Sequence, residues 1–270
     1  MTTTVPMLSV SDGVATIRLA RPDAGNAVDL PTAIALRDAV RAVGALEQVR
    51  VVVLRADGRL FCAGGDVRAM AAALERRAFV ADLAGVLHET LTALRALPVP
   101  VVAVIQGAAA GAGVGLVLAS DIVLAADHAT FVAAYPSVGL SPDCGVSALL
   151  PGAVGARRAA LFLLTGTPVD AATALDWGLV TEVCPAPDLD ARAGEVVAAI
   201  AALPREAVGE AARLLRLAGE RPYAVQLADE AATIARLAGG AEAGTLLESF
   251  AAPTHRTPRP DDRPSPGDTP

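Results

Sequence analysis

The sequence predicts an α/β protein in which a mixed-sheet core is followed by a region made only of helices. Up to about residue 188, short apolar runs of strand length alternate with apolar positions at helical spacing. From residue 189 to residue 250 the spacing is helical throughout, with breaks near Pro204 and Pro222. The 270 residues are 53% hydrophobic but only 3% aromatic, so alanine, valine and leucine must fill the core.

Composition and charge narrow the range of partners. The net charge of −7 and the pI of about 5.0 disfavour nucleic acids and anionic membranes. All 22 basic residues are arginine, so no lysine is available for Schiff-base chemistry. We expect no membrane-spanning helix and no export signal. The three cysteines lack metal-site spacing and the three histidines lie far apart, which predicts a cytoplasmic protein with reduced thiols and no bound metal.

The chain begins with a hairpin and continues with a helix and a buried strand. Residues 7–20 alternate around Asp12-Gly13, which is a favoured hairpin turn pair. Pro31 suits the first turn of a helix that we expect to run to about residue 47. The next expected elements are a strand at 49–55, a loop at 56–66 and a helical stretch at 67–97 with a break near 76–79.

The middle of the chain contains further strands around a glycine-rich turn. The β-branched run 101–105 follows two prolines and predicts a buried strand. The later expected elements are a helix at 114–119, strands at 121–126 and 130–133, a loop at 135–145, helices at 155–165 and 171–177, and a strand at 179–183. The proline-rich residues 253–270 predict a disordered tail.

The glycine-rich turn after residue 105 is the strongest functional signal. Nothing larger than a methyl group stands between Gln106 and Val114, so a ligand can approach the backbone closely. A strand, a small-residue turn and a helix N-terminus favour an anion or a developing oxyanion. A dinucleotide fingerprint is disfavoured because the residue three after Gly113 is Leu116 and not glycine. Close packing of the helix on the sheet is the structural alternative.

Several short motifs, in a fixed order, resemble the crotonase (enoyl-CoA hydratase/isomerase) superfamily. They are Arg21-Pro22 with Asn26-Ala27, Phe61-Cys62-Ala63-Gly64-Gly65-Asp66, Gly107-Ala108-Ala109-Ala110-Gly111-Ala112-Gly113 and Asp121-Ile122-Val123. The resemblance implies the ClpP/crotonase spiral fold of ββα repeats, with a core at 1–188 and a helical trimerisation region at 189–252. It also implies an acyl-CoA thioester substrate, no cofactor beyond that coenzyme A, and a homotrimer or a dimer of trimers.

The resemblance also assigns site residues. The N–H groups of Ala63 and Ala112 would hold the thioester oxygen as it becomes an enolate. The substrate-contacting positions would be Gly64, Asp66, Gly111, Gly115, Tyr135 and Leu140, although Asp66 also suits a structural role in its loop. The coenzyme A positions would be Asn26, Ala27, Arg59 and Phe61, with Arg55 as a second arginine for the phosphates. Arg55 and Arg59 are equally consistent with solvated surface arginines.

This chain departs from hydratases at both glutamate positions, which are Gly115 and Tyr135 here. Asp143 remains as a carboxylate, and its Pro-Asp-x-Gly segment resembles the ring-1,2-epoxyphenylacetyl-CoA isomerase branch of phenylacetate degradation. That branch also moves double bonds in enoyl-CoAs, as fatty acid metabolism requires. The resemblance therefore favours an isomerase in which Asp143 relays a proton.

Four alternatives remain for Asp143 and for the chain. Asp143 suits the cap of a helix starting at Cys144. It also suits a nucleophile, as in the dehalogenase branch of the superfamily. With both glutamates missing, the chain is also consistent with a non-catalytic acyl-CoA-binding homologue. The last alternative is a residual hydratase, a lyase that holds water between Asp143 and Tyr135.

Overall fold

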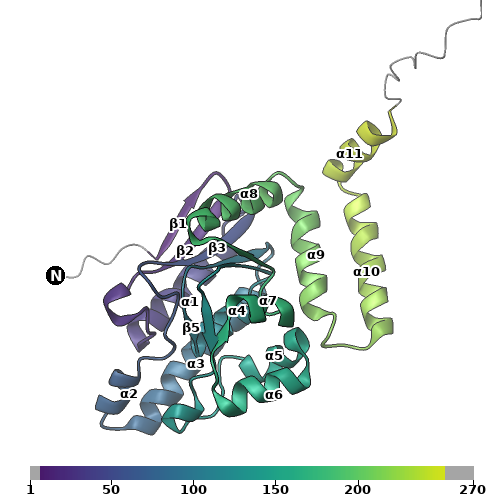
Figure 1. The fold of residues 1–270 in the computed structure, drawn as a ribbon. Coiled ribbons are helices and arrows are strands. Elements are labelled where there is room, and N and C mark those ends of the chain that lie inside the picture. The colour runs from purple at the N-terminus through teal and green to yellow at the C-terminus, as the bar shows by residue number, and fades with distance from the viewer. Residues whose placement is uncertain (1–6, 253–270) are drawn as a thin grey trace, which may run out of the picture. The chain divides into compact units, whose positions relative to one another are not determined.

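The structure is a computed structural model that describes residues 7–252, so the predicted disordered tail lies outside the described residues. The chain divides into two compact units, Met1–Gln226 and Leu227–Pro270, and the strands of the described region belong to the first (Figure 1). The strands are β1 (Leu8–Ser11), β2 (Val14–Leu19), β3 (Val51–Ala56), β4 (Val101–Ile105), β5 (Ala109–Ala110), β6 (Ile122–Ala126), β7 (Thr130–Val132), β8 (Val169–Asp170) and β9 (Glu182–Cys184). The α-helices are α1 (Leu30–Gly44), α2 (Val67–Ala72), α3 (Arg76–Arg95), α4 (Ala112–Leu118), α5 (Val146–Val154), α6 (Ala156–Thr165), α7 (Ala171–Trp177), α8 (Leu189–Ala201), α9 (Arg205–Leu217), α10 (Tyr223–Ala238) and α11 (Ala241–Ala251).

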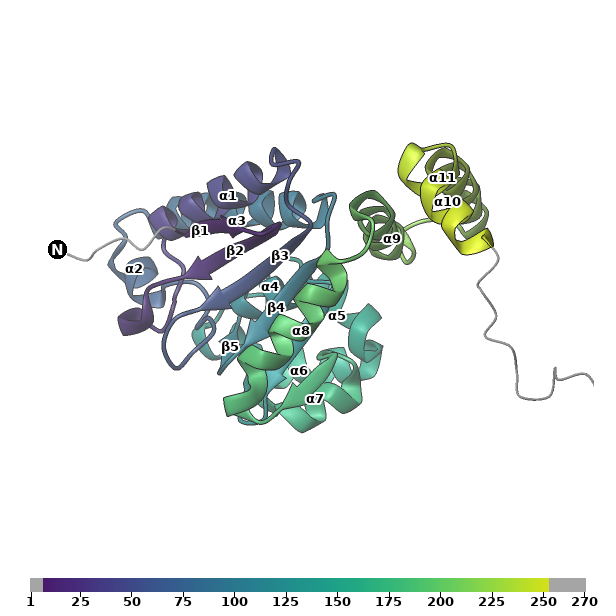
Figure 2. The ribbon, with the colours of Figure 1, turned by 90° about the horizontal axis from the view of Figure 1, so that it is seen from above.

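The main sheet has six strands in the order β1-β2-β3-β4-β6-β9. The β1–β2 pair is antiparallel and the other pairs are parallel, so the sheet is mixed as predicted. Both of its faces are covered: α1 and α3 lie along one side and α8 along the other (Figure 2). On β3, Val52 packs into the first core and Val53 into the second, because successive side chains of a strand point to opposite faces.

A second sheet, in the order β5-β7-β8, brings the loops of the site together. The sequence analysis missed β5 and β8, which have only two residues each and carry no detectable alternation. Strand β5 pairs in parallel with β7, and a bridge joins Cys62 to Ala109. A further bridge joins Val28 to Gly65. These contacts hold the loop after β3 against the turn that leads into α4.

Most of the expected elements are confirmed, with three corrections. The break between α2 and α3 lies at residues 73–75, before the predicted 76–79. Helix α5 occupies residues for which the sequence predicts no element, directly after the glycine-rich loop that ends at Gly145. Strand β9 is shifted toward the C-terminus from the predicted 179–183. The C-terminal region is helical with breaks at Pro204 and Pro222 as predicted, and the Gly239-Gly240 pair adds a third break. The predicted boundary between residues 188 and 189 stays a prediction.

Helix α9 is fixed to the core by a buried ion pair. The Arg216 guanidinium binds the Asp121 carboxylate with a shortest contact of 2.5 Å, and both side chains are largely buried. Asp121 also accepts a 2.7 Å hydrogen bond from the Val101 N–H at the start of β4. Asp121 therefore has a structural role in joining β4 to α9.

Within residues 7–252, none of the helices combines the length and the apolar character that crossing a bilayer requires.

Candidate active site

A cavity of about 190 Å³ lies beside the N-terminus of α4. Its wall is mostly apolar, and Asp143 is its only carboxylate among the described residues. The other polar side chains in the wall are the hydroxyls of Tyr135 and Ser141. The lining residues are Ala63, Gly64, Gly65, Val67, Met70, Val80, Leu83, Ala84, Leu87, Gly111, Ala112, Ala134, Tyr135, Val138, Leu140, Ser141 and Asp143.

The glycine-rich turn presents a free amide to this cavity. Gly111 has φ +50°, a conformation that L side chains rarely adopt, and it is the N-cap of α4. Ala112 is the first residue of α4, so its N–H has no acceptor within the helix. Within the part of the chain that the structure describes, this N–H donates to no other group. Ala112 thus lines the cavity with an unused donor, and its predicted contact with the thioester oxygen stays a prediction.

The Ala63 amide is engaged elsewhere, which corrects its expected role. The Ala63 N–H donates a 3.0 Å hydrogen bond to the carbonyl oxygen of Gly25, so it is not available to a ligand. The Gly65 N–H has no acceptor among residues 7–252. Val28 bonds to Gly64 and Asp66 on either side of Gly65, which turns the amide of Gly65 away from Val28. Gly65, and not Ala63, therefore carries the amide of this loop that is free to bind a ligand oxygen.

The Gly64-Gly65 segment lies close to the start of α4. Gly64 has φ +94°, and a Cβ built on it would lie 3.7 Å from the Ala112 nitrogen. Gly64 and Gly111 both line the cavity, as expected from the resemblance. Glycine at position 64 is favoured by the backbone conformation, and a Cβ there would also lie only 3.0 Å from the carbonyl oxygen of Ala110. The approach brings the loop that carries the Gly65 amide against the turn that carries the Ala112 amide.

Asp143 does not cap the following helix. The N-cap of α5 is Gly145, in the left-handed conformation, and the helix start has no side-chain cap. Only the main-chain carbonyl of Asp143 accepts a bond from this turn, donated by the Val146 N–H at 3.0 Å. The capping alternative is therefore wrong. The Asp143 side chain is half-buried and belongs to the cavity wall.

Tyr135 is a buried polar neighbour of Asp143. It is 8% exposed, and its hydroxyl donates a long 3.5 Å contact to the main-chain carbonyl of Asp143. Burial, with a smaller contribution from the Asp143 charge, raises the pKa of the Tyr135 hydroxyl far above its usual range. The phenol is therefore a hydrogen-bond donor at neutral pH and not a base. Leu140 lies further along the same loop, where its partly exposed side chain forms the rim.

Gly115 packs against the Asp143 loop and does not line the cavity. A Cβ at this position would lie 2.7 Å from both the Cβ and the carbonyl oxygen of Cys144. The expected contact between Gly115 and the substrate is thus replaced by a contact with the chain itself. The loop that carries Asp143 fills the space that a side chain at position 115 would need, so no glutamate fits there unless this loop moves.

We predict that Gly115→Ala lowers the free energy of unfolding by about 1–3 kcal/mol, because the added methyl group overpacks a buried contact. Urea denaturation monitored by circular dichroism measures this change. Gly152→Ala is the matched control, since Gly152 is also helical and a Cβ there has no neighbour within 4 Å. Equal stability of the two variants would contradict the packing argument.

The thiols near the site are packing groups. Burial raises the pKa of the Cys62 thiol to about 11. Burial and then the nearby Asp143 charge raise the pKa of the Cys144 thiol still further. Both thiols stay protonated at neutral pH, so neither has the thiolate character of a nucleophile.

Asp66 has a structural role in the loop. Its carboxylate caps α2 by accepting a 3.1 Å hydrogen bond from the Ala69 N–H, and it lies 3.4 Å from the Arg21 guanidinium. The same guanidinium contacts Asp29 at 3.1 Å. Asp66 is absent from the cavity wall. The substrate contact expected for Asp66 is therefore replaced by bonds that hold the Gly64-Gly65 loop in place.

The expected coenzyme A residues differ in accessibility. Asn26 is buried, with φ +56°, and its side chain bonds to the Arg21 amide and to the carbonyls of Asp57 and Leu60. Asn26 therefore organises the loop that carries Arg59, and all its polar atoms are in use. Ala27 is buried as well, and its carbonyl accepts a 2.5 Å bond from Arg21.

Phe61, Arg55 and Arg59 are the remaining residues that were expected to lie near coenzyme A. The Phe61 ring is fully buried in the main core, so only its backbone can face a ligand. Arg55 forms a 2.7 Å ion pair with Asp190, whereas Arg59 is exposed. Among the described residues Arg59 has no ion-pair partner. Arg59 is thus the better candidate for a phosphate contact.

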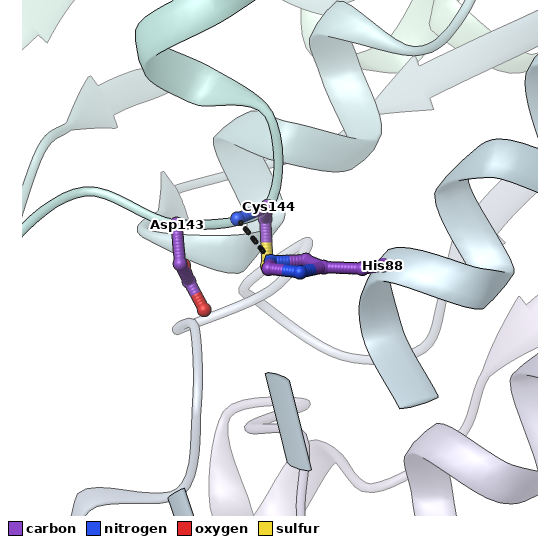
Figure 3. A group of neighbouring side chains, drawn as sticks. All are labelled: His88, Asp143 and Cys144. Carbon is purple, nitrogen blue, oxygen red and sulfur yellow. Dashed lines mark hydrogen bonds between the residues drawn. The ribbon is translucent and has the colours of Figure 1, made fainter. Parts of the chain in front are cut away.

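His88 joins the site from α3, which the sequence analysis did not foresee (Figure 3). A ring nitrogen of His88, a carboxylate oxygen of Asp143 and the Cys144 sulfur all lie within 4.8 Å of one another. His88 Nε2 accepts a 3.2 Å hydrogen bond from the Cys144 N–H. A metal would need a Cys144 thiolate, which burial opposes, so the group suits acid–base chemistry better. His88 is 56 residues from Cys144, and no local sequence pattern connects them.

The fold and the site together define an enzyme architecture of the crotonase type, and the comparisons with known proteins agree. The enoyl-CoA hydratase/isomerase family model matches residues 9–244. The chain therefore belongs to the enoyl-CoA hydratase/isomerase family, members of which act on acyl-CoA thioesters. The predicted superfamily is confirmed.

Individual relatives carry different activities in their names. The chain is 35% identical over 201 residues to 4-chlorobenzoyl coenzyme A dehalogenase-2 of Arthrobacter, across 74% of this chain and 73% of the relative. It is 34% identical over 185 residues to the trans-2-decenoyl-[acyl-carrier-protein] isomerase of Streptococcus mutans, across 66% and 68%. The crystal structure of an enoyl-CoA hydratase from Mycobacterium smegmatis superposes with a TM-score of 0.85 at 33% identity, covering 91% of this chain and 96% of that chain. These comparisons confirm the crotonase fold. Because the relatives are named for different reactions, the reaction of this protein is argued from its site.

Proposed function

We propose that the protein is an acyl-CoA isomerase that moves a proton, and with it a double bond, through an enolate. The observation that carries this proposal is one carboxylate, Asp143, in a mostly apolar cavity that is also lined by Gly65 and Ala112, whose amides have no acceptor among the described residues. Moving a proton within one substrate needs a single group that takes it and returns it. A second acid or base is not required.

The reaction follows from these groups. The thioester oxygen accepts hydrogen bonds from the Gly65 and Ala112 N–H groups, which stabilise the negative charge that develops on it. The Asp143 carboxylate takes a proton from C2 of a 3-enoyl thioester, and the carbon electron pair delocalises into the thioester as a dienolate. The resulting carboxylic acid returns the proton to C4, which leaves the double bond between C2 and C3.

Hydration of a double bond is the less favoured reaction. It needs a base for water and an acid for C2, and this cavity offers one carboxylate among the described residues. Position 115 is closed to a side chain by Cys144, and Tyr135 keeps its proton at neutral pH. A hydratase-like lyase and a non-catalytic acyl-CoA-binding protein therefore remain as outcomes of the test.

The test is incubation of the protein with 3-enoyl-CoA and, separately, with 2-enoyl-CoA. Formation of the conjugated 2-enoyl thioester, followed by its ultraviolet absorbance and with no change of mass, is expected from the first substrate. A product heavier by one water from 2-enoyl-CoA would favour the hydratase instead. Tight binding of both substrates without any turnover would favour a non-catalytic protein.

A second candidate is hydrolytic displacement of a halide from an acyl-CoA, which is considered because one relative is named a 4-chlorobenzoyl coenzyme A dehalogenase. The observation that favours it is His88, with a ring nitrogen within 4.8 Å of the Asp143 carboxylate. Asp143 would attack the substrate, expel halide and form an ester. Water deprotonated by a base such as imidazole would then cleave the ester at the Asp143 carbonyl.

The two candidates are separated by labelled water. Under hydrolytic displacement of a 4-halobenzoyl-CoA, turnover in water labelled with heavy oxygen places the label in the peptide that contains Asp143. Isomerisation makes no bond to Asp143 oxygen, so it leaves that peptide unlabelled. Peptide mass spectrometry reads out the difference.

The wall of the cavity favours an acyl group without polar substituents. Met70, Val80, Leu83 and Leu87 line it from α2 and α3, and a polar substituent among them would lose its hydrogen bonds to water.

We further propose that the protein acts in the cytoplasm as a trimer or a dimer of trimers. Phenylacetate degradation and fatty acid metabolism are the pathways that the isomerase proposal favours, with coenzyme A entering only as part of the substrate.

Within this proposal, Arg59→Ala is expected to raise KM for acyl-CoA about fivefold and to leave kcat unchanged, since an exposed ion pair contributes about 1 kcal/mol. Steady-state kinetics measure the change. Arg157→Ala is the control, because Arg157 is an exposed arginine on α6, outside the loop at 56–66. An acyl thioester of N-acetylcysteamine lacks phosphates and should not distinguish the variants. A KM that stays at the wild-type value with acyl-CoA would argue against the phosphate contact.

A further inference from the structure

A second and larger cavity lies behind the catalytic carboxylate. It has a volume of about 860 Å³, and residues of α3, α5 and α9 form most of its wall. The two cavities share no lining residue, but they meet at two pairs of neighbours in the chain. Leu87 lines the first cavity and His88 the second, while Asp143 lines the first and Cys144 the second. A thin wall at these two pairs therefore separates the substrate side from the second cavity.

His88 stands on the far side of this wall from the substrate. Its ring nitrogen lies within 4.8 Å of an Asp143 carboxylate oxygen, a gap that a single water can bridge with two hydrogen bonds of about 2.8 Å. His88 is exposed, so the ring also reaches solvent. Figure 3 shows the side chains of Asp143 and His88 on either side of Cys144. Asp143 and His88 together thus connect the interior of the first cavity with the solvent of the second.

A main-chain hydrogen bond selects the form of the imidazole. The Cys144 N–H donates to His88 Nε2 at 3.2 Å, so the lone pair is on Nε2 and the neutral ring carries its hydrogen on Nδ1. The Nε2 lone pair of the neutral ring can accept a proton when the hydrogen bond from the Cys144 N–H gives way.

The charged groups around the second cavity are largely occupied with one another. Arg95 pairs with Glu220 at 2.5 Å, and Arg213 pairs with Glu210. Arg216 is held by Asp121. The Cys144 thiol, which also lines this cavity, has a pKa raised by burial and does not exchange its proton as an acid at neutral pH. These pairings leave His88 as the side chain best suited to pass protons between Asp143 and this cavity.

We propose that His88 exchanges the proton on Asp143 with solvent from the side opposite the substrate. The proposal rests on the proposed isomerase function and deepens it, because it assigns a group that resets the protonation state of the single base. His88 acts through Asp143 and does not touch the substrate, so it is a positioning and relay residue.

The relay returns Asp143 to its carboxylate form. Asp143 takes a proton from the substrate carbon and becomes a carboxylic acid. His88 Nε2 takes up a proton through one bridging water, which receives the hydron of Asp143, and this regenerates the carboxylate and forms imidazolium. The contact from the Cys144 N–H gives way at this step. Nδ1 then releases its hydrogen to water in the second cavity, and the bridging water exchanges its hydrogens with that solvent. The reverse sequence therefore passes a solvent hydron from the bridging water to Asp143 and on to the substrate.

The test is isomerisation of 3-enoyl-CoA in deuterium oxide, with deuterium per molecule of product counted by mass spectrometry. His88→Gln can retain an acceptor for the Cys144 N–H but cannot take up a proton at neutral pH. His88→Leu loses both properties. We expect both variants to incorporate several-fold less deuterium per turnover than the wild-type protein, because the abstracted hydron then returns to the substrate before it exchanges.

The two variants distinguish a proton relay from a purely structural role of His88. Wild-type incorporation in His88→Gln with a loss only in His88→Leu would overturn the relay and leave a structural role. Unchanged incorporation in both variants would overturn it as well, because Asp143 would then exchange through the mouth of the first cavity. If the wild-type protein does not isomerise the substrate at all, the proposed function fails, and that result is visible before the variants are compared.

Discussion

Replacing Asp143 by asparagine is expected to lower kcat for isomerisation of 3-enoyl-CoA by about 10²–10⁴-fold, the usual contribution of a positioned general base. Asparagine has nearly the same shape and retains hydrogen-bonding atoms, but its amide does not accept a proton at neutral pH. KM should change little, since the thioester oxygen and the coenzyme A are held by other groups. Steady-state kinetics on 3-enoyl-CoA measure both constants.

Ser141→Ala is the control for this variant. Ser141 lies in the same loop and in the wall of the same cavity, but its hydroxyl is not a base at neutral pH. The control should therefore keep wild-type kcat. The isomerase proposal is abandoned if Asp143→Asn isomerises at the wild-type rate. Because the Asp143 side chain does not cap α5, the substitution removes no helix cap, and thermal melts of the two variants should coincide.

The main sheet and its helices followed from local patterns in the sequence. The strands β3 and β4 are continuous apolar runs because both faces of the sheet are covered, and such runs are recognisable without a structure. The small sheet was not recognisable, because β5 and β8 have two residues each and exist only through pairing with β7. Helix α5 was missed because Pro151 and the preceding glycine-rich loop obscured its pattern.

The candidate site was predictable where it depends on one local segment and not where it depends on pairing between segments. Ala112 followed from a strand, a glycine-rich turn and a helix start within one stretch. The choice between Ala63 and Gly65 could not be made from the loop alone. The bond from Ala63 to Gly25 and the bridge between Val28 and Gly65 decide which amide is free, and both are non-local.

Asp143 and His88 illustrate the same distinction. Because Asp143 follows a proline, the sequence made a helix-capping role plausible for this residue. Only the left-handed Gly145 at the start of α5 excludes that role. His88 lies on α3, and its approach to Cys144 depends on how α3 packs beside the loop that precedes α5. No spacing in the sequence encodes that contact. The two side chains that would handle the proton thus come from elements that the fold, and not the local sequence, brings together.

The proposed oxyanion donor at the start of α4, the Ala112 N–H, can be removed by a single substitution, Ala112→Pro, with an expected loss of about 10²–10³ in kcat, the contribution of one such donor. Proline lacks an N–H, and its fixed φ suits the first position of a helix, where the amide makes no helical bond. Ala112 is that position, and the preceding Gly111 already has a positive φ and no side chain to clash with the ring. The helix should therefore form as before while the donor is lost.

Ala156→Pro provides the matched control. Ala156 is the first residue of α6, it follows Gly155 with a positive φ, and it lies outside both cavities. The two variants make the same chemical change at equivalent helix positions, so their stabilities in urea should be similar. Only Ala112→Pro should lose activity, and it should also weaken binding of a thioester analogue whose oxygen carries enolate-like charge. If Ala112→Pro keeps full activity, the amide of residue 112 does not hold the reacting oxygen. The proton chemistry assigned to Asp143 would then need a different source of enolate stabilisation.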